Sequence, residues 1–198
     1  MRRVSNRVVA AVIALVFLAS AGFAQDAFRY KELPNFHRVN ERLYRGGQPR
    51  RGGMDRLAQL GIKTVIDLRG DGKRADDEAA EARAAGLRYF NIPLSNFGRP
   101  ADAQVKQILS IINTLENQPV FIHCRRGSDR TGMIIAVFRI SSDGWTSERA
   151  LEEARRHGMG WWAFAMKDYV NDYYRDQAIN EPYRDQTRHH EQRTGAVP

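Results

Sequence analysis

One stretch, VFIHCRRGSDRTGMIIAVF from Val120 to Phe138, limits the possible folds of this chain more than any other. Together with Pro119, its first part is a short continuous apolar run, which is typical of a strand buried on both faces. The run RTGMIIAVFRI that follows predicts a buried helix. The residues between the two runs therefore form a loop at the carboxyl end of a strand, where open α/β sheets bind their ligands.

The rest of the chain alternates between strand-like and helix-like segments. We expect strands at Lys63–Arg69 and Leu87–Leu94, where β-branched and aromatic residues cluster. Helices are predicted over the segments MDRLAQLG, DEAAEARAAG, AQVKQILSIINTLEN, TSERALEEARRHG and WWAFAMKDYVNDYY. The segment Leu43–Pro49, LYRGGQP, is predicted to be a turn-rich lead-in. This alternation predicts an α/β fold with a central, mostly parallel sheet flanked by helices.

The last predicted helix carries an aromatic stripe. Two neighbouring rows at helical spacing contain Trp161, Ala165, Tyr169 and Tyr173, and Trp162, Met166 and Val170. A stripe of this kind is typical of a helix face that packs on a core, so we expect core residues here and not a binding platform.

The first 24 residues differ from the rest in a way that predicts export. The positive segment MRRVSNR precedes an apolar run of 14 residues, which is too short for a comfortable membrane span. Gly22 and Ala24 are small residues at the positions that a signal peptidase reads. We therefore expect a cleaved signal peptide over residues 1–24 and a periplasmic or secreted protein. A retained N-terminal anchor is the alternative.

The length of 198 residues is that of one domain. We assign residues 25–42 to an N-terminal extension, 43–178 to the domain itself, and 179–198 to a polar tail that frays. His189 and His190 lie in this tail without the further ligands that a metal site needs, so no metal is expected there.

The formal net charge is +8, and arginine supplies most of the excess. A nucleic-acid-binding protein usually gathers such charge in one stripe with interleaved aromatic residues. Here the arginines are spread along the chain, so we expect no nucleic-acid partner. We also expect a monomer, with no membrane span once the signal segment is removed.

Cys124 is the only cysteine of the chain, so it forms no internal disulfide and serves either packing or reactivity. Its surroundings favour reactivity. The following helix presents free N–H groups at its N-terminus, and Gly127 lets the backbone turn them inward as an anion nest. Arg130 can bind two oxygens of a phosphate. The same positive field lowers the pKa of a thiol, so a thiolate is expected at the base of a phosphate-sized cradle.

The segment HCRRGSDRTG resembles the signature of the cysteine-dependent protein tyrosine phosphatase superfamily, in which His-Cys is followed by five residues, Arg, and Ser or Thr. The segments LYRGGQP and VIDLR are similar to small bacterial dual-specificity-type members, so the resemblance spans about Leu43 to Tyr174. It implies metal-independent hydrolysis of phosphotyrosine- or phosphoserine-type groups on proteins. The reaction of this superfamily passes through a cysteinyl-phosphate and uses no cofactor.

The resemblance also assigns roles to single residues. Cys124 matches the nucleophile and Arg130 the phosphate clamp, while Thr131 assists the second step and His123 orients the loop. The loop whose N–H groups bind the phosphate consists of Arg125, Arg126, Gly127, Ser128 and Asp129.

One position departs from the family pattern. The superfamily usually carries an aspartate general acid on a loop before the cysteine, and the matching loop PLSNFGRP has Asn96 there, which supplies no proton. Asp129 is the substitute that we favour, although pairing with a neighbouring arginine explains it equally well. Asp102 is a second substitute, and a helix N-cap explains that residue.

The rim of the cradle is more cationic than a phosphotyrosine pocket requires. Arg125 and Arg126 leave inositol phosphates and phospholipid headgroups open as substrates, unless these side chains point to solvent. Arg45 and Arg69 are two further arginines that could reach the same rim.

Three other functions compete with a phosphatase. A sulfurtransferase of the rhodanese kind has a loop one residue shorter, which would place the closing arginine where Asp129 stands. A catalytically weak phosphate-binding module is consistent with Asn96 but does not need Cys124, Arg130 and Thr131 together. A structural cysteine is the fourth possibility, which the surrounding loop disfavours.

Overall fold

A computed structural model describes residues 30–177 and 179 of the chain. The predicted signal segment and nearly all of the predicted tail lie outside these residues. Within the part that is described, none of the helices combines the length and the apolar character needed to cross a membrane.

The sheet has five strands, and the cysteine strand is at its centre. The strands are β1 (His37–Arg38), β2 (Leu43–Gly47), β3 (Thr64–Asp67), β4 (Arg88–Asn91) and β5 (Val120–Cys124). Their order in space is β1-β2-β5-β3-β4, and only the β1–β2 pair is antiparallel. The register places Gly47 beside Cys124 on one side and Asp67 beside His123 on the other. The predicted mostly parallel sheet is therefore confirmed.

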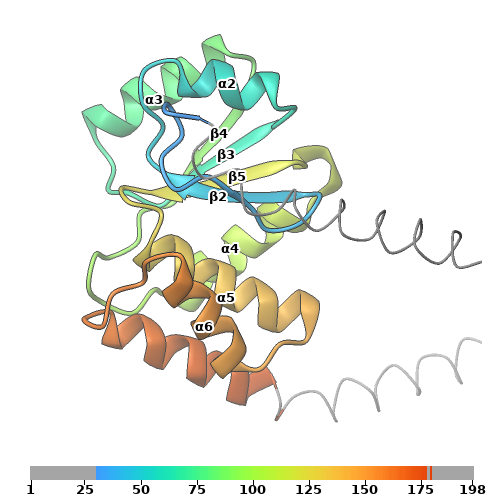
Figure 1. Cartoon of the computed structure of the whole chain (residues 1–198), viewed down its shortest axis with the longest axis vertical. Helices are drawn as coiled ribbons and strands as arrows, with labels where there is room; N and C mark the ends of the chain where they lie inside the picture. Colours follow the sequence, from blue (N-terminus) through green and yellow to red (C-terminus); the bar gives the residue numbers. More distant parts are fainter. Residues whose placement is uncertain (1–29, 178, 180–198) are drawn as a thin grey trace, which may run out of the picture.

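Helices cover both faces of this sheet. They are α2 (Gly53–Gln59), α3 (Lys73–Ala84), α4 (Asp102–Asn113), the 3-10 helix η3 (Leu115–Asn117), α5 (Asp129–Asp143), α6 (Ser147–Arg156) and a last helix over 164–177. Helices α2 and α3 lie on one face, and α4, α5, α6 and the last helix lie on the other (Figure 1).

Two cores form because successive residues of a strand point to opposite faces. Val65 and Phe121 belong to the smaller core under α2 and α3, while Ile66 and Ile122 belong to the larger core under α4 and α5. Every residue of β5 is buried, which explains its continuous apolar sequence.

The segment Leu43–Pro49, predicted to be a turn-rich lead-in, begins with strand β2, so this prediction is wrong. Gly46 fits the strand because Phe121 packs directly on it, and a Cβ there would lie 2.7 Å from the ring. The domain also starts before the predicted boundary. Leu33 and Phe36 are buried in the smaller core, and β1 extends the sheet, so residues 30–42 belong to the domain rather than to an extension.

The aromatic stripe is divided between core and surface. Met166, Tyr169 and Val170 are at most 5% exposed, as expected for core residues. Trp161 and Trp162 are 72% and 42% exposed, so their prediction as core is wrong. The reason is that the helix begins at residue 164, and the two tryptophans lie in a turn where helical spacing does not apply.

Candidate active site

The loop Arg125–Ser128 connects the carboxyl end of the central strand to the N-terminus of α5. Gly127 has a φ of 74°, a left-handed conformation that favours glycine. A Cβ at this position would also lie 2.4 Å from the backbone of Gly46 on β2. Gly127 is therefore required both for the turn and for the close contact with the neighbouring strand.

The carbonyl groups of this loop point away from the cavity into the surrounding protein. The carbonyls of Arg125–Gly127 accept hydrogen bonds from the backbone N–H of Gln48 at 3.2 Å, from Asn35 Nδ2 at 3.2 Å, and from Arg45 Nη2 at 2.8 Å. A planar trans peptide directs its N–H opposite to its C=O. The loop N–H groups are consequently left for an anion in the cavity.

The Cys124 side chain is 3% exposed and lies at the wall of this cavity. Burial alone would raise the pKa of its thiol. The adjacent Thr131 hydroxyl and backbone N–H, the charge of Arg130, and the N–H of Gly127 outweigh this effect and lower the pKa below its usual value. The geometry therefore favours a thiolate, which is the reactive form of cysteine.

Arg130, at the start of α5, is held in place by the ends of two strand segments. Its Nη1 donates hydrogen bonds to the carbonyls of Leu68 at 3.1 Å and Leu94 at 3.4 Å. Within the described residues its Nε and Nη2 have no such bonds, so a guanidinium edge is available to bind two oxygens of a phosphate.

Arg45 lies behind the loop and not at the rim, where the sequence had placed it as a possibility. It is 1% exposed, and burial lowers the pKa of its guanidinium to about 10. In the described part of the chain, its Nε and Nη1 lack hydrogen-bond partners. Glu153 and the Cys124 thiolate are the anions that favour its charge. The buried Arg45 guanidinium therefore has the Cys124 thiolate as one of its counter-ions.

A cavity of about 570 Å³ opens above Cys124. Its lining consists of Asn96, Phe97, Cys124, Arg125, Arg126, Asp129 and Arg130. The predicted nucleophile and clamp therefore meet three of the loop residues in one place, and Asn96 lines the same cavity.

Asp129 is held by two hydrogen bonds in the cavity wall. Its Oδ1 accepts one from the backbone N–H of Gly160 at 2.8 Å, and its Oδ2 accepts one from Arg126 Nη2 at 2.8 Å. The predicted pairing with a neighbouring arginine is present. A general-acid role for Asp129 stays a prediction, since the same carboxylate also anchors the turn before the last helix.

Asp102 does not line the cavity above Cys124. It is the first residue of α4 and not its N-cap, which is Ala101, so the predicted cap is wrong. The Ala101 N–H donates instead to Gln104 Oε1 at 3.0 Å. The Asp102 carboxylate accepts a hydrogen bond from the Tyr169 hydroxyl at 2.9 Å, which links α4 to the last helix.

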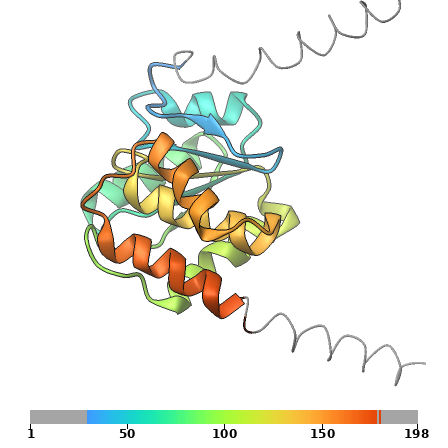
Figure 2. The same cartoon turned by 60° about the horizontal axis from the view of Figure 1, so that its bottom comes forward.

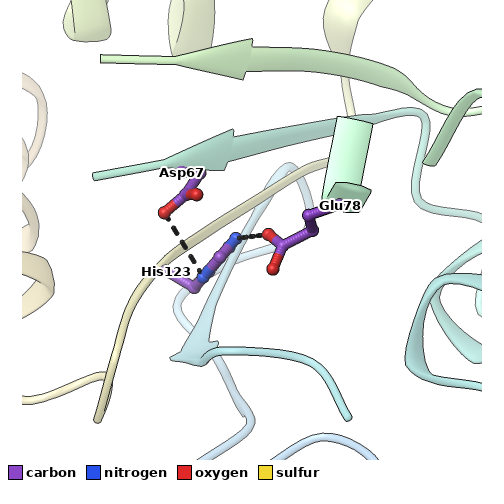
Figure 3. A group of neighbouring side chains, drawn as sticks. All are labelled: Asp67, Glu78 and His123. Carbon is purple, nitrogen blue, oxygen red and sulfur yellow. Dashed lines mark ion pairs between the residues drawn. The ribbon is translucent and has the colours of Figure 1, made fainter. Parts of the chain in front are cut away.

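His123 projects from β5 between Asp67 of β3 and Glu78 of α3 (Figure 3). Its Nε2 lies 2.8 Å from Glu78 Oε1, and its Nδ1 lies 3.3 Å from the Cys124 carbonyl oxygen. All three side chains are buried. The ring is therefore fixed by Glu78 on one side and contacts Cys124, the residue before the loop, on the other, as an orienting role requires.

The ligand atoms of Asp67, Glu78 and His123 lie within 4.8 Å of one another, a spacing that could hold a metal ion. Arg69, however, already pairs with both carboxylates, at 2.7 Å to Asp67 and 2.6 Å to Glu78. Burial opposes it, but the hydrogen bond from Arg69 lowers the pKa of Asp67. We interpret this cluster as a support for His123, with Arg69 as its cation. Arg69 therefore serves this network first, although it also borders a neighbouring cavity.

A parallel sheet whose central strand delivers a cysteine into a nest of N–H groups closed by an arginine is the arrangement of the cysteine-dependent phosphatase class. Residues 29–172 match the model of the family described as DSP-PTPase phosphatase fused to NAD+ kinase. The chain belongs to this family, and the resemblance inferred from its signature is confirmed.

Individual relatives agree with this membership. The dual specificity protein phosphatase TpbA of Pseudomonas aeruginosa (strain UCBPP-PA14) is 34% identical over 127 residues, which are 64% of this chain and 56% of that protein. The inositol diphosphatase DSP5 of Arabidopsis thaliana is 29% identical over 139 residues, 65% of this chain and 64% of that protein. The chain thus spans somewhat more than half the length of these relatives. A crystal structure of a P. aeruginosa TpbA variant in complex with pTyr is similar with a TM-score of 0.60 at 27% identity, covering 73% of this chain and 90% of that one.

Several supporting residues had no signal in the sequence. Asn35 and Arg45 reach the loop from about 90 and 82 residues away, and Glu78 reaches His123 from another helix. For Arg45 the segment LYRGGQP was a partial signal, because its glycines mark a close backbone contact. Asn35 and Glu78 lie in unremarkable polar segments.

Proposed function

We propose that this protein is a metal-independent phosphomonoesterase that acts through a cysteinyl-phosphate on phosphotyrosine- and phosphoserine-type groups of proteins. The observation that carries the proposal is the position of the buried Cys124 thiol at the wall of a cavity that is also lined by Arg130 and by residues of the loop, an arrangement that lowers the pKa of the thiol. The name of the TpbA relative and the crystal structure of its complex with pTyr support a protein substrate.

In the first step the Cys124 thiolate attacks phosphorus while the ester P–O bond breaks and the leaving oxygen takes a proton. Arg130 and the loop N–H groups bind the equatorial oxygens, where negative charge is spread in the transition state. In the second step water attacks the cysteinyl-phosphate, the P–S bond breaks and the thiolate returns. The buried Thr131 hydroxyl has no other hydrogen-bond partner among the described residues, so it is available to donate to the sulfur and stabilise it as the leaving group.

Substrates differ in how much their leaving oxygen needs a proton from a general acid. Asn96 lines the cavity and is the residue that we match to the aspartate of the superfamily, but it supplies no proton. Asp129 is the one carboxyl residue among those that line this cavity. We therefore expect good leaving groups to be hydrolysed faster than poor ones, because general acid catalysis typically contributes 10²–10⁴-fold.

The test is hydrolysis of an aryl phosphate by the full chain and by its Cys124→Ser variant, with a chelator present and across pH. Turnover that depends on Cys124 supports the proposal. Equal turnover by the variant would exclude a cysteine nucleophile. A wild-type protein that binds phosphate without hydrolysing the aryl ester would be a phosphate-binding module.

A second cavity favours polyanionic small molecules as the alternative substrate class. This cavity, of about 400 Å³, shares Arg125 and Arg130 with the first and adds Lys73 and Arg74 at the N-terminus of α3. Arg74 forms no hydrogen bond or ion pair with the described residues, and Asp71 is the only acid among the lining residues. A second phosphate on the same molecule would meet these cations, and the relative named inositol diphosphatase supports this class.

A paired variant distinguishes the two classes of substrate. Arg74→Gln combined with Lys73→Gln is expected to lower kcat/KM for inositol polyphosphates about tenfold or more, with little change for an aryl phosphate or a phosphotyrosine peptide. Equal effects on all three substrates would argue against the second cavity as a substrate site.

We also propose that the protein is exported to the periplasm or secreted, with cleavage after Ala24. The basic, apolar and small-residue parts of the first 24 residues support this. N-terminal sequencing of the protein recovered from its native host is expected to begin at Gln25. A retained Met1 would indicate an anchored protein instead.

A further inference from the structure

Four large aromatic side chains are exposed at the end of the molecule that carries the cavity. They are Phe97 (76% exposed), Trp161 (72%), Trp162 (42%) and Phe164 (60%), and together we call them the aromatic rim. They come from the loop that follows β4 and from the turn and first residue of the last helix, and both views place these two segments at the same end of the domain (Figures 1 and 2). Apolar side chains gathered in this way usually mark an interaction surface.

The aromatic rim starts at the cavity and continues outward from it. Phe97 and Arg126 both line the cavity, and the Arg126 guanidinium lies 5.7 Å from the centre of the Trp162 ring. The centre of the Trp161 ring is 6.0 Å from the rings of Trp162 and Phe164. The exposed tryptophans and the substrate entrance therefore belong to one continuous surface.

Cations are interleaved with these rings. Arg125 and Arg126 are exposed at the cavity edge, and Lys167 lies 5.7 Å from the centre of the Phe164 ring. Lys167 Nζ also donates a hydrogen bond to the Trp161 carbonyl at 3.1 Å, which holds its charge beside the aromatic turn. The acids of the same surface are Asp168, which is exposed, and Asp129, which pairs with Arg126 at 2.8 Å, so the three cations outnumber them by one. A surface with this charge complements an anionic partner.

The shape of the surface favours a flat partner over a peptide. A peptide is bound through grooves that receive its side chains, yet Trp161, Trp162 and Phe164 are not among the residues that line the cavity above Cys124 or the two cavities beside it that share Arg125. Trp161 and Trp162 are exposed in a turn instead, and Phe164 is exposed at the first residue of the last helix. Protruding tryptophan and phenylalanine flanked by lysine and arginine are typical of segments that insert into the headgroup region of a bilayer.

We propose that the aromatic rim docks this protein on the surface of an anionic phospholipid bilayer. Trp161 and Phe164 enter the headgroup layer, and Arg125, Arg126 and Lys167 face the lipid phosphates. The mouth of the cavity then opens toward the bilayer, so that phosphate esters held at a membrane surface are the ones presented to Cys124. This docking goes beyond the proposed hydrolysis and does not require it.

The tryptophans themselves report the docking. The chain has three, Trp145, Trp161 and Trp162, so a Trp145→Phe background leaves fluorescence only in the aromatic rim. The experiment uses the full chain with Cys124→Ser and measures quenching by brominated lipids in vesicles of phosphatidylglycerol mixed with phosphatidylcholine. The apolar N-terminal segment contains no tryptophan, so its own contact with vesicles does not produce this signal.

We expect strong quenching by the anionic vesicles, weaker quenching by phosphatidylcholine alone, and a loss of quenching as salt increases. In sedimentation, Trp161→Ser combined with Phe164→Ser should weaken vesicle binding about tenfold or more, because two exposed rings lose their apolar contact. Leu115→Ser is the matched control, since Leu115 is 71% exposed outside the aromatic rim and its loss should change nothing.

Three results would overturn the proposal. The first is an absence of quenching by anionic vesicles. The second is equal vesicle sedimentation of the double variant and the wild type, which would assign binding to another segment. The third combines two observations on proteins that keep Cys124. The wild type does not bind vesicles, and the double variant hydrolyses phosphopeptides in solution more slowly than the wild type but keeps its rate on an aryl phosphate. That result would assign the aromatic rim to a protein substrate.

Discussion

Arg45 provides a demanding test of how the fold activates its cysteine. We predict that Arg45→Met raises the pKa of the Cys124 thiol by about one unit while the stability of the fold changes little. The two effects separate because the charge of Arg45 is costly to the fold and useful to the thiolate. Methionine keeps most of the buried volume without the charge.

The expected stability change is a small difference between two larger quantities. Burial lowers the pKa of Arg45 from 12.5 to about 10, so keeping it charged at neutral pH costs the folded state about 3 kcal/mol. Because the folded-state pKa is the lower one, this cost is fully present at neutral pH and declines as the pH rises through about 10. The variant removes the cost but also loses the hydrogen bond to the Gly127 carbonyl, which as a bond from a charged donor contributes ~1.5–3 kcal/mol. The net change in the free energy of unfolding should stay within about 2 kcal/mol.

The assay is alkylation by iodoacetamide at a series of pH values, which reads the thiolate fraction of the only cysteine in the chain. Urea unfolding measures stability in parallel. Arg88→Met is the matched control, because Arg88 is exposed at the far end of β4. An unchanged inflection in Arg45→Met would refute electrostatic coupling to the thiolate. A loss of stability well above 3 kcal/mol would show that Arg45 is mainly a structural residue.

Three other predictions concern the loop and its support. Gly127→Ala should lower the free energy of unfolding, measured in urea, by at least ~2 kcal/mol, because alanine is strained at the left-handed φ and its Cβ would clash with Gly46. Full stability would contradict the close contact. Glu78→Gln should lower kcat several-fold and raise the pH at which Cys124 alkylation has its inflection, since His123 and Arg69 both lose a charged partner. Unchanged kinetics would exclude a positioning role for Glu78. Asn96→Asp should accelerate phosphoserine hydrolysis far more than aryl phosphate hydrolysis, since only the poor leaving group needs an acid. If the variant affects both substrates equally, Asp129 is the acid to test, by Asp129→Asn.

The centre of the site was predictable because its signals are local. A strand, a glycine turn and a helix start are adjacent in sequence around Cys124, and a parallel sheet forces such a loop to its carboxyl edge. The apolar run of β5 also predicted burial on both faces correctly, since a strand that is covered by helices on both faces needs apolar residues at successive positions.

The support of the site was not predictable, because it depends on contacts between residues far apart in the chain. The glycines beside Arg45 mark a close backbone contact but do not indicate that its guanidinium ends beneath Gly127, and nothing local to Asn35 indicates that its amide holds two loop carbonyls. Glu78 likewise resembles any acid on an exposed helix until α3 packs against His123.

The errors in secondary structure have a similar origin. Gly46 and Gly47 are turn residues by composition, but tertiary contact with Phe121 and with the cysteine loop makes them strand residues. Trp161 and Trp162 continue the helical spacing of the residues after them, yet the helix starts only at residue 164. The Gly160 N–H donates a hydrogen bond to Asp129, which holds the preceding turn. Periodicity predicts the face of a helix only where the helix exists.

The most direct test of a cysteinyl-phosphate mechanism is to trap the intermediate. The full chain is mixed with an aryl phosphate, quenched in acid within the first turnover, digested, and analysed by mass spectrometry. The account predicts a phosphate on the peptide that contains Cys124 in the wild type, more of it in Thr131→Val, and none in Cys124→Ser. Hydrolysis that proceeds without phosphate on Cys124, or that survives Cys124→Ser, would contradict it.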